Sequence, residues 1–242
     1  MNKPRGIVFY DGPSALDGSP IIGIAVFRSA NAKTGDMVQT FILRADMAPL
    51  AAIDSGADAS ICGDCVHRGI PGARKRTCYV DVAKSVQSVY AAWTRGAYPL
   101  MSPAQGARML QGRIVRIGAY GDPAAIPARH WRDLISLTSG WTGYTHQWRR
   151  AIARGLRSLV MASADSESDR DIARAMGWRT FRVRTETQPL GEREIVCPAS
   201  PEGGNRRQCI DCQACDGASR GPAQASVAII VHGALAKHFT PA

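Results

Sequence analysis

Short apolar runs near the start of the chain predict strands, and the segments that follow them predict helices. Residues 21–27 and 38–43 are apolar runs of strand length on either side of a turn-forming segment, 31–36, so they predict a β-hairpin. Residues 49–59 are rich in alanine, and residues 82–94 place apolar side chains at helical spacing. We therefore expect strands over residues 1–48 and helices within residues 49–110.

The middle of the chain alternates regularly between the two patterns. Strands are predicted at 113–118, 142–146, 158–163 and 179–183, with helices at 127–137, 149–157 and 169–176 between them. This order is typical of parallel strands joined by helical crossovers. It predicts an α/β fold, either a partial or distorted β/α barrel or, as the alternative, an open parallel α/β sheet.

The remaining segments complete a single domain over residues 1–242. Residues 111–190 form the β/α core, and residues 191–242 hold a cysteine-rich, metal-binding loop region between strands at 194–196 and 226–231. No window reaches the roughly 18 apolar residues of a membrane span, so no membrane partner is expected. The first ten residues lack an apolar leader core, which predicts a cytoplasmic location. The sequence does not determine an oligomeric state.

The charge balance favours a polyanionic partner. Lys and Arg number 30 against 20 Asp and Glu, for a net charge of +10. Such a surplus indicates nucleic acid or a nucleotide, although a high-GC genome would also enrich arginine. The candidate contacts are the basic residues that follow one another in loops: Arg74, Lys75, Arg76, Arg149, Arg150, Arg206 and Arg207.

Seven cysteines fall in two groups about 120 residues apart. An odd number in a chain expected to be cytoplasmic argues against disulfides and favours metal binding. The second group has the spacing Cys197-x11-Cys209-x2-Cys212-x2-Cys215. Three cysteines in a Cys-x2-Cys-x2-Cys run are typical of ferredoxin loops, so a [4Fe–4S] cluster is favoured over zinc. Four buried thiols without a ligand are the remaining alternative.

The first cysteine group, Cys62-x2-Cys65-x12-Cys78, has only three thiols. His67 would complete a four-ligand zinc site. Alternatively, three thiolates would leave one iron of a [4Fe–4S] cluster open for a substrate or for S-adenosylmethionine. A third arrangement would bring both cysteine groups to one metal site. The sequence therefore predicts one or two clusters, with zinc as the alternative.

Polar residues follow three of the predicted parallel strands. The carboxyl ends of such strands meet at one edge of a sheet, where sites form. We therefore expect five side chains to converge on one pocket as candidate catalytic residues: Asp122, Tyr144, His146, Ser163 and Asp165. Taken singly, the two aspartates also suit turns and helix caps. Tyr144, Trp141 and Trp148 could stack on a base or pack in the core.

Several short motifs occur in the order found in a phage protein family. They are Asn31-Ala32-Lys33-Thr34-Gly35, Cys62-Gly63-Asp64-Cys65, Cys78-Tyr79, Tyr120-Gly121-Asp122-Pro123, Gly143-Tyr144-Thr145-His146-Gln147-Trp148 and Ser163-Ala164-Asp165. On these motifs, the chain from about Asn31 to Cys215 resembles phage and prophage cysteine-motif proteins related to the mycobacteriophage gene-product-88 group. The resemblance implies a bacteriophage origin and the host cytoplasm. It implies no particular activity.

A weaker likeness connects the chain with radical S-adenosylmethionine enzymes. It is carried by the three-cysteine group, the β/α repeat and the second four-cysteine group. The Cys62-x2-Cys65-x12-Cys78 spacing departs from the usual Cys-x3-Cys-x2-Cys signature of that family, and no glycine-rich adenosylmethionine motif is evident.

Three hypotheses of function follow from the sequence. The first is a phage-type iron–sulfur protein with enzymatic chemistry, resembling radical S-adenosylmethionine enzymes, that acts on a nucleotide or nucleic acid. The second is a zinc-stabilised protein that binds nucleic acid without catalysis, through the basic residues above and Arg68. The third is a partner-binding protein in which metal only holds the fold.

Overall fold

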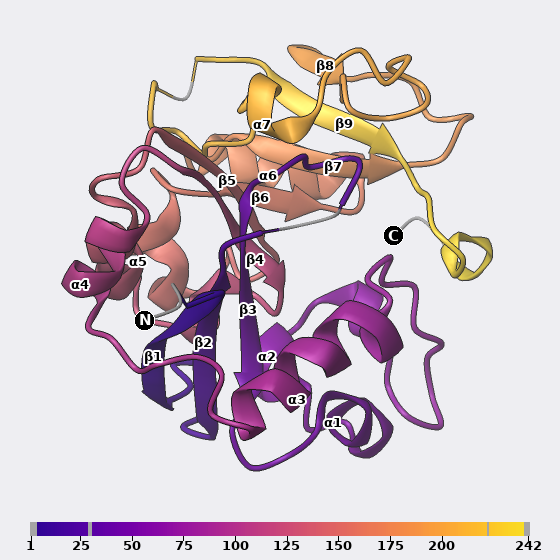
Figure 1. Cartoon of the computed structure of the whole chain (residues 1–242). Coiled ribbons are helices and arrows are strands. Elements are labelled where there is room, and N and C mark those ends of the chain that lie inside the picture. Colours follow the sequence, from indigo (N-terminus) through magenta and orange to yellow (C-terminus); the bar gives the residue numbers. More distant parts are fainter. Residues whose placement is uncertain (1–3, 29–30, 222, 240–242) are drawn as a thin grey trace.

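The computed structural model describes residues 4–28, 31–221 and 223–239 of the chain. Met1, Asn2 and Lys3, part of the stretch expected to lack a leader, lie outside the described residues. In the described part, nine strands form one sheet in the order β1-β2-β3-β4-β5-β6-β7-β9-β8 (Figure 1). Their bounds are β1 Gly6–Pro13, β2 Pro20–Val26, β3 Val38–Arg44, β4 Ile114–Tyr120, β5 Gly140–Thr145, β6 Met161–Ala164, β7 Thr180–Arg184, β8 Glu194–Val196 and β9 Ser226–Ile230.

The α/β class and the N-terminal hairpin are confirmed. β2 pairs antiparallel with β1 and β3, and each later pairing along the sheet is parallel. Of the two predicted architectures, the open sheet is the observed one, because β1 and β8 end the strand order without pairing in the described structure. A closed barrel would require the first and last strands of the order to pair with each other.

Helices cover the sheet from two sides. The α-helices are α1 Pro49–Ser55, α2 Ala59–Cys62, α3 Gln87–Thr94, α4 Pro103–Met109, α5 Ala128–Ile135, α6 Glu167–Ala175 and α7 Cys209–Cys212. Short 3-10 helices, and in the case of η2 a π-helix, are η1 Val66–Arg68, η2 Val82–Val86, η3 Pro123–Ala125, η4 Ala151–Leu156 and η5 Ala236–His238. Figure 1 shows α4 and α5 on one side of β1–β3 and α1, α2 and α3 on the other.

The crossovers from β4 to β7 explain which face stays open. These four strands are neighbours in chain order, and right-handed connections between such strands place α5, η4 and α6 on the same face. Trp131 of α5 is fully buried there, 5.1 Å from the ring of Phe9, and its indole donates to Pro123 O at 2.9 Å. The opposite face of the sheet is left for the cysteine loops.

One predicted helix has a different form. Residues 149–157 were expected to be α-helical, and the structure forms the 3-10 turn η4 instead. Gly155 lowers helical stability there, and a side chain at this position would lie 3.0 Å from the Ala128 methyl group at the start of α5. The connection between β5 and β6 is therefore short and tightly packed.

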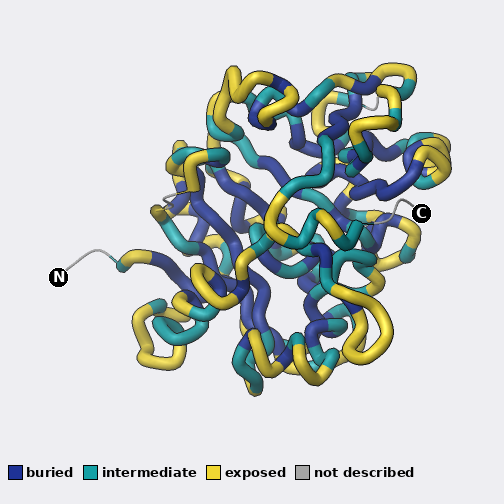
Figure 2. The backbone as a smooth tube through the Cα atoms, turned by 90° about the vertical axis from the view of Figure 1, so that its right-hand side faces the viewer, coloured by how far each residue is buried: buried dark blue, intermediate teal, exposed yellow. Residues whose placement is uncertain are grey.

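Buried segments run through the centre of the molecule and exposed residues lie in the loops around it (Figure 2). One large apolar cluster joins β1–β5 with α3 and α5, and a smaller one joins β6, β7 and β9 with the second cysteine group. None of the helices in the described residues is both long and apolar enough to cross a membrane.

Candidate functional site

One cavity of about 790 Å³ receives side chains from both cysteine groups. Its floor is the open face of the sheet, because alternate residues of neighbouring strands line it, as the two-residue period of a strand requires. These floor residues are Gln39 and Phe41 of β3, Arg116, Gly118 and Tyr120 of β4, Thr142 and Tyr144 of β5, Phe181 and Val183 of β7, and Val227 and Ile229 of β9. All seven cysteines line the same cavity, and none forms a disulfide.

The first cysteine loop is held against the end of β5. Cys62 ends α2, and its carbonyl accepts a hydrogen bond from Gln147 Nε2 at 3.2 Å. Gly63 follows with φ +56°, and a Cβ there would lie 2.4 Å from the Gln147 side chain, so only glycine fits this approach. Burial raises the pKa of both Cys62 and Cys78. Cys65 and Cys78 add to the rise at Cys62, so the three thiols form one electrostatic unit.

The second cysteine loop is anchored at three places. Cys197 directly follows β8, and its backbone N–H donates to Ala228 O at 2.8 Å. Cys209 begins α7, and its backbone N–H donates to Lys33 O at 3.0 Å. This hydrogen bond connects α7 to the turn after β2. Buried Arg179 donates to Asp216 and to the carbonyl oxygens of Ala214, Gly217 and Ala225. These contacts fix Cys215, whose thiol has its pKa raised to about 12 by burial, although Tyr144 opposes that effect.

A buried cation, Arg116, and a half-buried one, Lys33, lie beside the second cysteine group. Arg116 interacts with Cys209 and Cys215, and Lys33 with Cys197, Cys209 and Cys215. Arg116 donates to Tyr79 Oη at 2.5 Å, and Lys33 Nζ lies 3.2 Å from His232 Nε2. In the part of the chain that the structure describes, neither cation forms an ion pair with a carboxylate. The other four buried arginines, Arg170, Arg179, Arg182 and Arg184, each do.

The carboxyl edge of the sheet brings together three of the predicted residues. Asp122, after β4, accepts from Thr145 Oγ1 and from the His146 backbone N–H, both at 2.7 Å. His146, after β5, directs Nε2 toward Asp165 Oδ2 at 3.3 Å. Asp122 and His146 line the cavity together with Ser163 of β6, and Asp165 lies directly behind them. Asp122 thus uses both carboxylate oxygens to position the His146 segment.

His67 does not turn toward the cysteines. Its Nε2 lies 2.8 Å from Asp165 Oδ1 and its Nδ1 lies 2.8 Å from Thr77 Oγ1, so both ring nitrogens already have partners. The geometry therefore does not favour His67 as the fourth ligand of the first cysteine group. His146 is the imidazole that interacts with Cys65.

Tyr144 is the predicted stacking residue that reaches the cavity. Its ring lies 4.3 Å from Phe181 and 5.3 Å from the Arg116 guanidinium carbon. Burial raises the pKa of its phenol, so the hydroxyl stays protonated at neutral pH. Trp148 and Trp141 pack with the core instead, and their indoles donate to Ser163 O and Leu159 O.

The arginines and lysine predicted to contact nucleic acid differ in exposure. Arg74, Lys75, Arg206 and Arg207 are exposed. Arg76 is half-buried, lies 3.5 Å from Asp58 and donates to Arg68 O. Arg149 stacks on Trp148 and pairs with Asp169, and Arg150 donates to Leu16 O. The last three thus have structural partners.

The sequence reasoning did not single out Lys33 or Arg116. Arg116 lies in an otherwise apolar strand, and a charged residue inside such a run is a signal that could have indicated an inward-facing cation. Lys33 sits in a turn, where a lysine is ordinary, so no local signal marks it.

Comparisons with known proteins give no independent indication of function: no family model, curated protein or solved structure matches this chain.

Proposed function

We propose that this protein is an iron–sulfur enzyme of phage type that holds two [4Fe–4S] clusters, one on each cysteine group, around a shared substrate cavity. The observation that carries the proposal is the convergence of all seven cysteines on one cavity beside Arg116 and Lys33, which have no carboxylate partner among the described residues. The cavity volume of about 790 Å³ is in the range of small-molecule sites, about 300–1,000 Å³.

Charge balance supports metal binding at the second cysteine group. If its thiols were protonated, Arg116 would be buried and Lys33 half-buried without compensating charge, which is costly above all for Arg116. Burial keeps unligated thiols neutral, as the raised pKa of Cys215 indicates. A metal or cluster with four thiolate ligands carries net negative charge and would compensate both cations.

The spacing of the thiols favours a cluster over zinc. Tetrahedral zinc with bonds of about 2.3 Å holds its thiolates about 3.8 Å apart. In the described structure, no three cysteine sulfurs lie within 4.8 Å of one another. The Cys209-x2-Cys212-x2-Cys215 run, typical of ferredoxin loops, suits a [4Fe–4S] cluster, in which each cysteine binds a different iron atom.

The three-cysteine group supports a reactive cluster. With ligands Cys62, Cys65 and Cys78, one iron would lack a protein ligand and could bind a substrate or S-adenosylmethionine. The cluster would supply one-electron transfer there. Tyr144 and Phe181 form an apolar wall of the same cavity, suited to a base or another planar group. We take the substrate to be a nucleotide, or a nucleic acid that presents a nucleotide to the cavity.

The phage origin and the host cytoplasm as its location are part of the same proposal. They rest on the resemblance to the mycobacteriophage gene-product-88 group and on the reducing environment that unpaired cysteines require.

Anaerobic purification followed by metal analysis tests the proposal. We expect a brown protein with absorbance near 400 nm and about eight iron and eight sulfide per chain. Reduction in the presence of S-adenosylmethionine then tests for cleavage of that molecule. A colourless protein that takes up no iron on reconstitution and holds zinc would overturn the iron–sulfur assignment. Salt-dependent nucleic-acid binding would then support the zinc-stabilised alternative.

Replacing Arg116 with methionine tests the charge balance, because it should shift the melting temperature in opposite directions in metal-free and in metal-loaded protein. In metal-free protein, Arg116→Met should raise the melting temperature, since it removes an uncompensated buried charge. In metal-loaded protein, it should lower the melting temperature, since the charge then balances thiolates. The control is Arg182→Met, which leaves buried Glu194 with only the longer 3.8 Å ion pair to Arg170 and should lower the melting temperature in both states. The same sign for Arg116→Met in both states would contradict the argument.

A further inference from the structure

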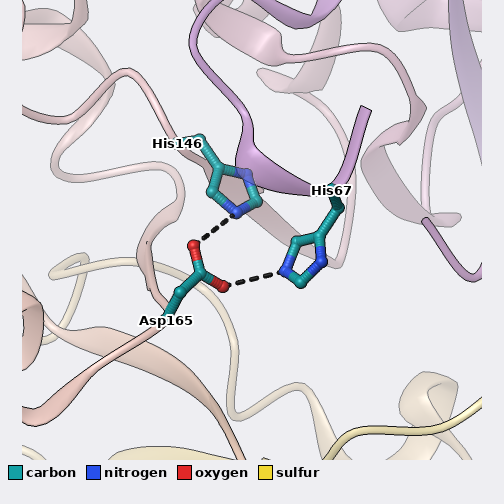
Figure 3. A group of neighbouring side chains, drawn as sticks. All are labelled: His67, His146 and Asp165. Carbon is teal, nitrogen blue, oxygen red and sulfur yellow. Dashed lines mark hydrogen bonds and ion pairs between the residues drawn. The ribbon is translucent and has the colours of Figure 1, made fainter. Parts of the chain in front are cut away.

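We propose that His67, His146 and Asp165 bind one divalent transition-metal ion at a site separate from the cysteine groups. In the described chain, these are the three side chains whose ligand atoms all lie within 4.8 Å of one another. Figure 3 shows both imidazoles directed at the same carboxylate. They come from three distant segments: η1, the end of β5 and the end of β6.

The distances suit a single ion. His67 Nε2 lies 2.8 Å from Asp165 Oδ1, and His146 Nε2 lies 3.3 Å from Asp165 Oδ2. Ligands bound at about 2.0–2.2 Å to one metal stand about 3 Å apart, so small shifts would admit the ion. In the described structure, no cysteine sulfur belongs to this group of atoms, although His146 also interacts with Cys65.

The surroundings orient both imidazoles as ligands. Metal-binding histidines usually engage the other ring nitrogen with a nearby oxygen. Thr77 Oγ1 fills this role for His67 Nδ1 at 2.8 Å, which leaves Nε2 for the metal. The backbone of His146 is held by Asp122 Oδ2 at 2.7 Å.

One ring nitrogen of the group has no hydrogen-bond partner in the described structure. His146 Nε2 is buried and has no hydrogen bond of good geometry, although it faces the Asp165 carboxylate. The two imidazole rings lie edge to face, with centroids 5.5 Å apart, next to the same carboxylate. A metal ion at this position would coordinate the Nε2 atoms of both imidazoles.

The donor set indicates the class of metal. Two imidazoles and one carboxylate with open coordination positions are typical of ferrous iron and of zinc. His67 and His146 line the cavity, whereas Asp165 lies behind them, so the open positions would face the cavity. Phe239 stacks on His67 at 5.6 Å and covers one side of that ring.

Mn²⁺ is the probe that tests this site, because it favours oxygen and nitrogen ligands and binds thiolates poorly. Titration of the anaerobically purified full chain, followed by the electron paramagnetic resonance signal of unbound Mn²⁺, should show one bound ion per chain. Zn²⁺ and Fe²⁺ should displace it. Asp165→Asn and His67→Gln should each weaken Mn²⁺ binding at least tenfold, and Thr77→Val about tenfold by releasing His67.

The matched controls are His130→Gln and Asp133→Asn on α5, which should leave Mn²⁺ affinity unchanged. Iron content and absorbance near 400 nm are measured on the same samples. Asp165→Asn should retain both, so loss of Mn²⁺ binding cannot be attributed to unfolding. If the wild-type chain binds no Mn²⁺, or both site variants bind it as tightly as the wild type, the proposal is wrong even when iron is present. Mn²⁺ binding without iron would instead contradict only the proposed clusters.

Discussion

Replacing Cys215 with alanine is expected to remove about four of about eight iron atoms per chain. Cys215 is a buried member of the second cysteine group, and its thiol interacts with Cys197, Cys209 and Cys212. A cluster that loses one of its four thiolate ligands is held more weakly. Iron, sulfide and absorbance near 400 nm in the anaerobically purified variant provide the measurement.

The matched variant is Cys78→Ala in the first cysteine group. It should remove the other half of the iron and leave the second cluster in place. The double variant should be free of iron. If either single variant loses all iron, the two groups share one metal site, contrary to the proposal of two. If both retain the wild-type amount, these thiols are not ligands.

Replacing Glu194 with glutamine is expected to lower the free energy of unfolding by about 3–5 kcal/mol, because it leaves a buried arginine unpaired. Glu194 of β8 and Arg182 of β7 are both fully buried. Arg182 donates to Glu194 Oε2 through Nη2 at 2.6 Å and to Oε1 through Nε at 2.9 Å. Glu167, at 3.9 Å, is half-exposed and would compensate only part of the lost charge.

Chemical denaturation of the anaerobically purified protein measures this effect. Glu186→Gln is the control, since Glu186 is exposed in the following loop and should change stability by less than about 0.5 kcal/mol. The double variant Arg182→Met, Glu194→Leu should recover most of the loss, because it removes both charges. An effect of Glu194→Gln no larger than that of Glu186→Gln would show that the pair contributes little to stability.

Much of the fold was predictable because the sequence repeats local signals. The apolar runs that became β2, β3, β4, β5, β7 and β9 are each bounded by turn residues, and α6 has an N-cap at Ser166 and ends before Gly177. α4 was missed although it carries a recognisable signal. Ser102, Pro103 and Gln105 form a capping box with proline at the first helical position.

The candidate site was predictable in part. The placement of Asp122, His146 and Asp165 after successive parallel strands indicated that they would meet, and their contacts show that they do. The association of His67 with them was not predictable, because it depends on how the first cysteine loop folds back over the sheet. Likewise, the alternation of residues in β7 suggests that Arg182 faces solvent. In the structure, Arg182 is buried by β8 and by the loop that follows β7, where it donates to Pro189 O.

The sequence by itself determined the α/β order of elements, the two cysteine groups and the residues at the strand ends. These follow from periodicity and spacing within short stretches, which local physical chemistry controls. Only the tertiary structure decided that both cysteine groups face one cavity, that Arg116 and Lys33 stand beside the second group, and that two histidines share Asp165. Each of these juxtapositions joins residues many positions apart. They depend on which face of the sheet the crossovers leave open, and short-range sequence patterns do not determine that face.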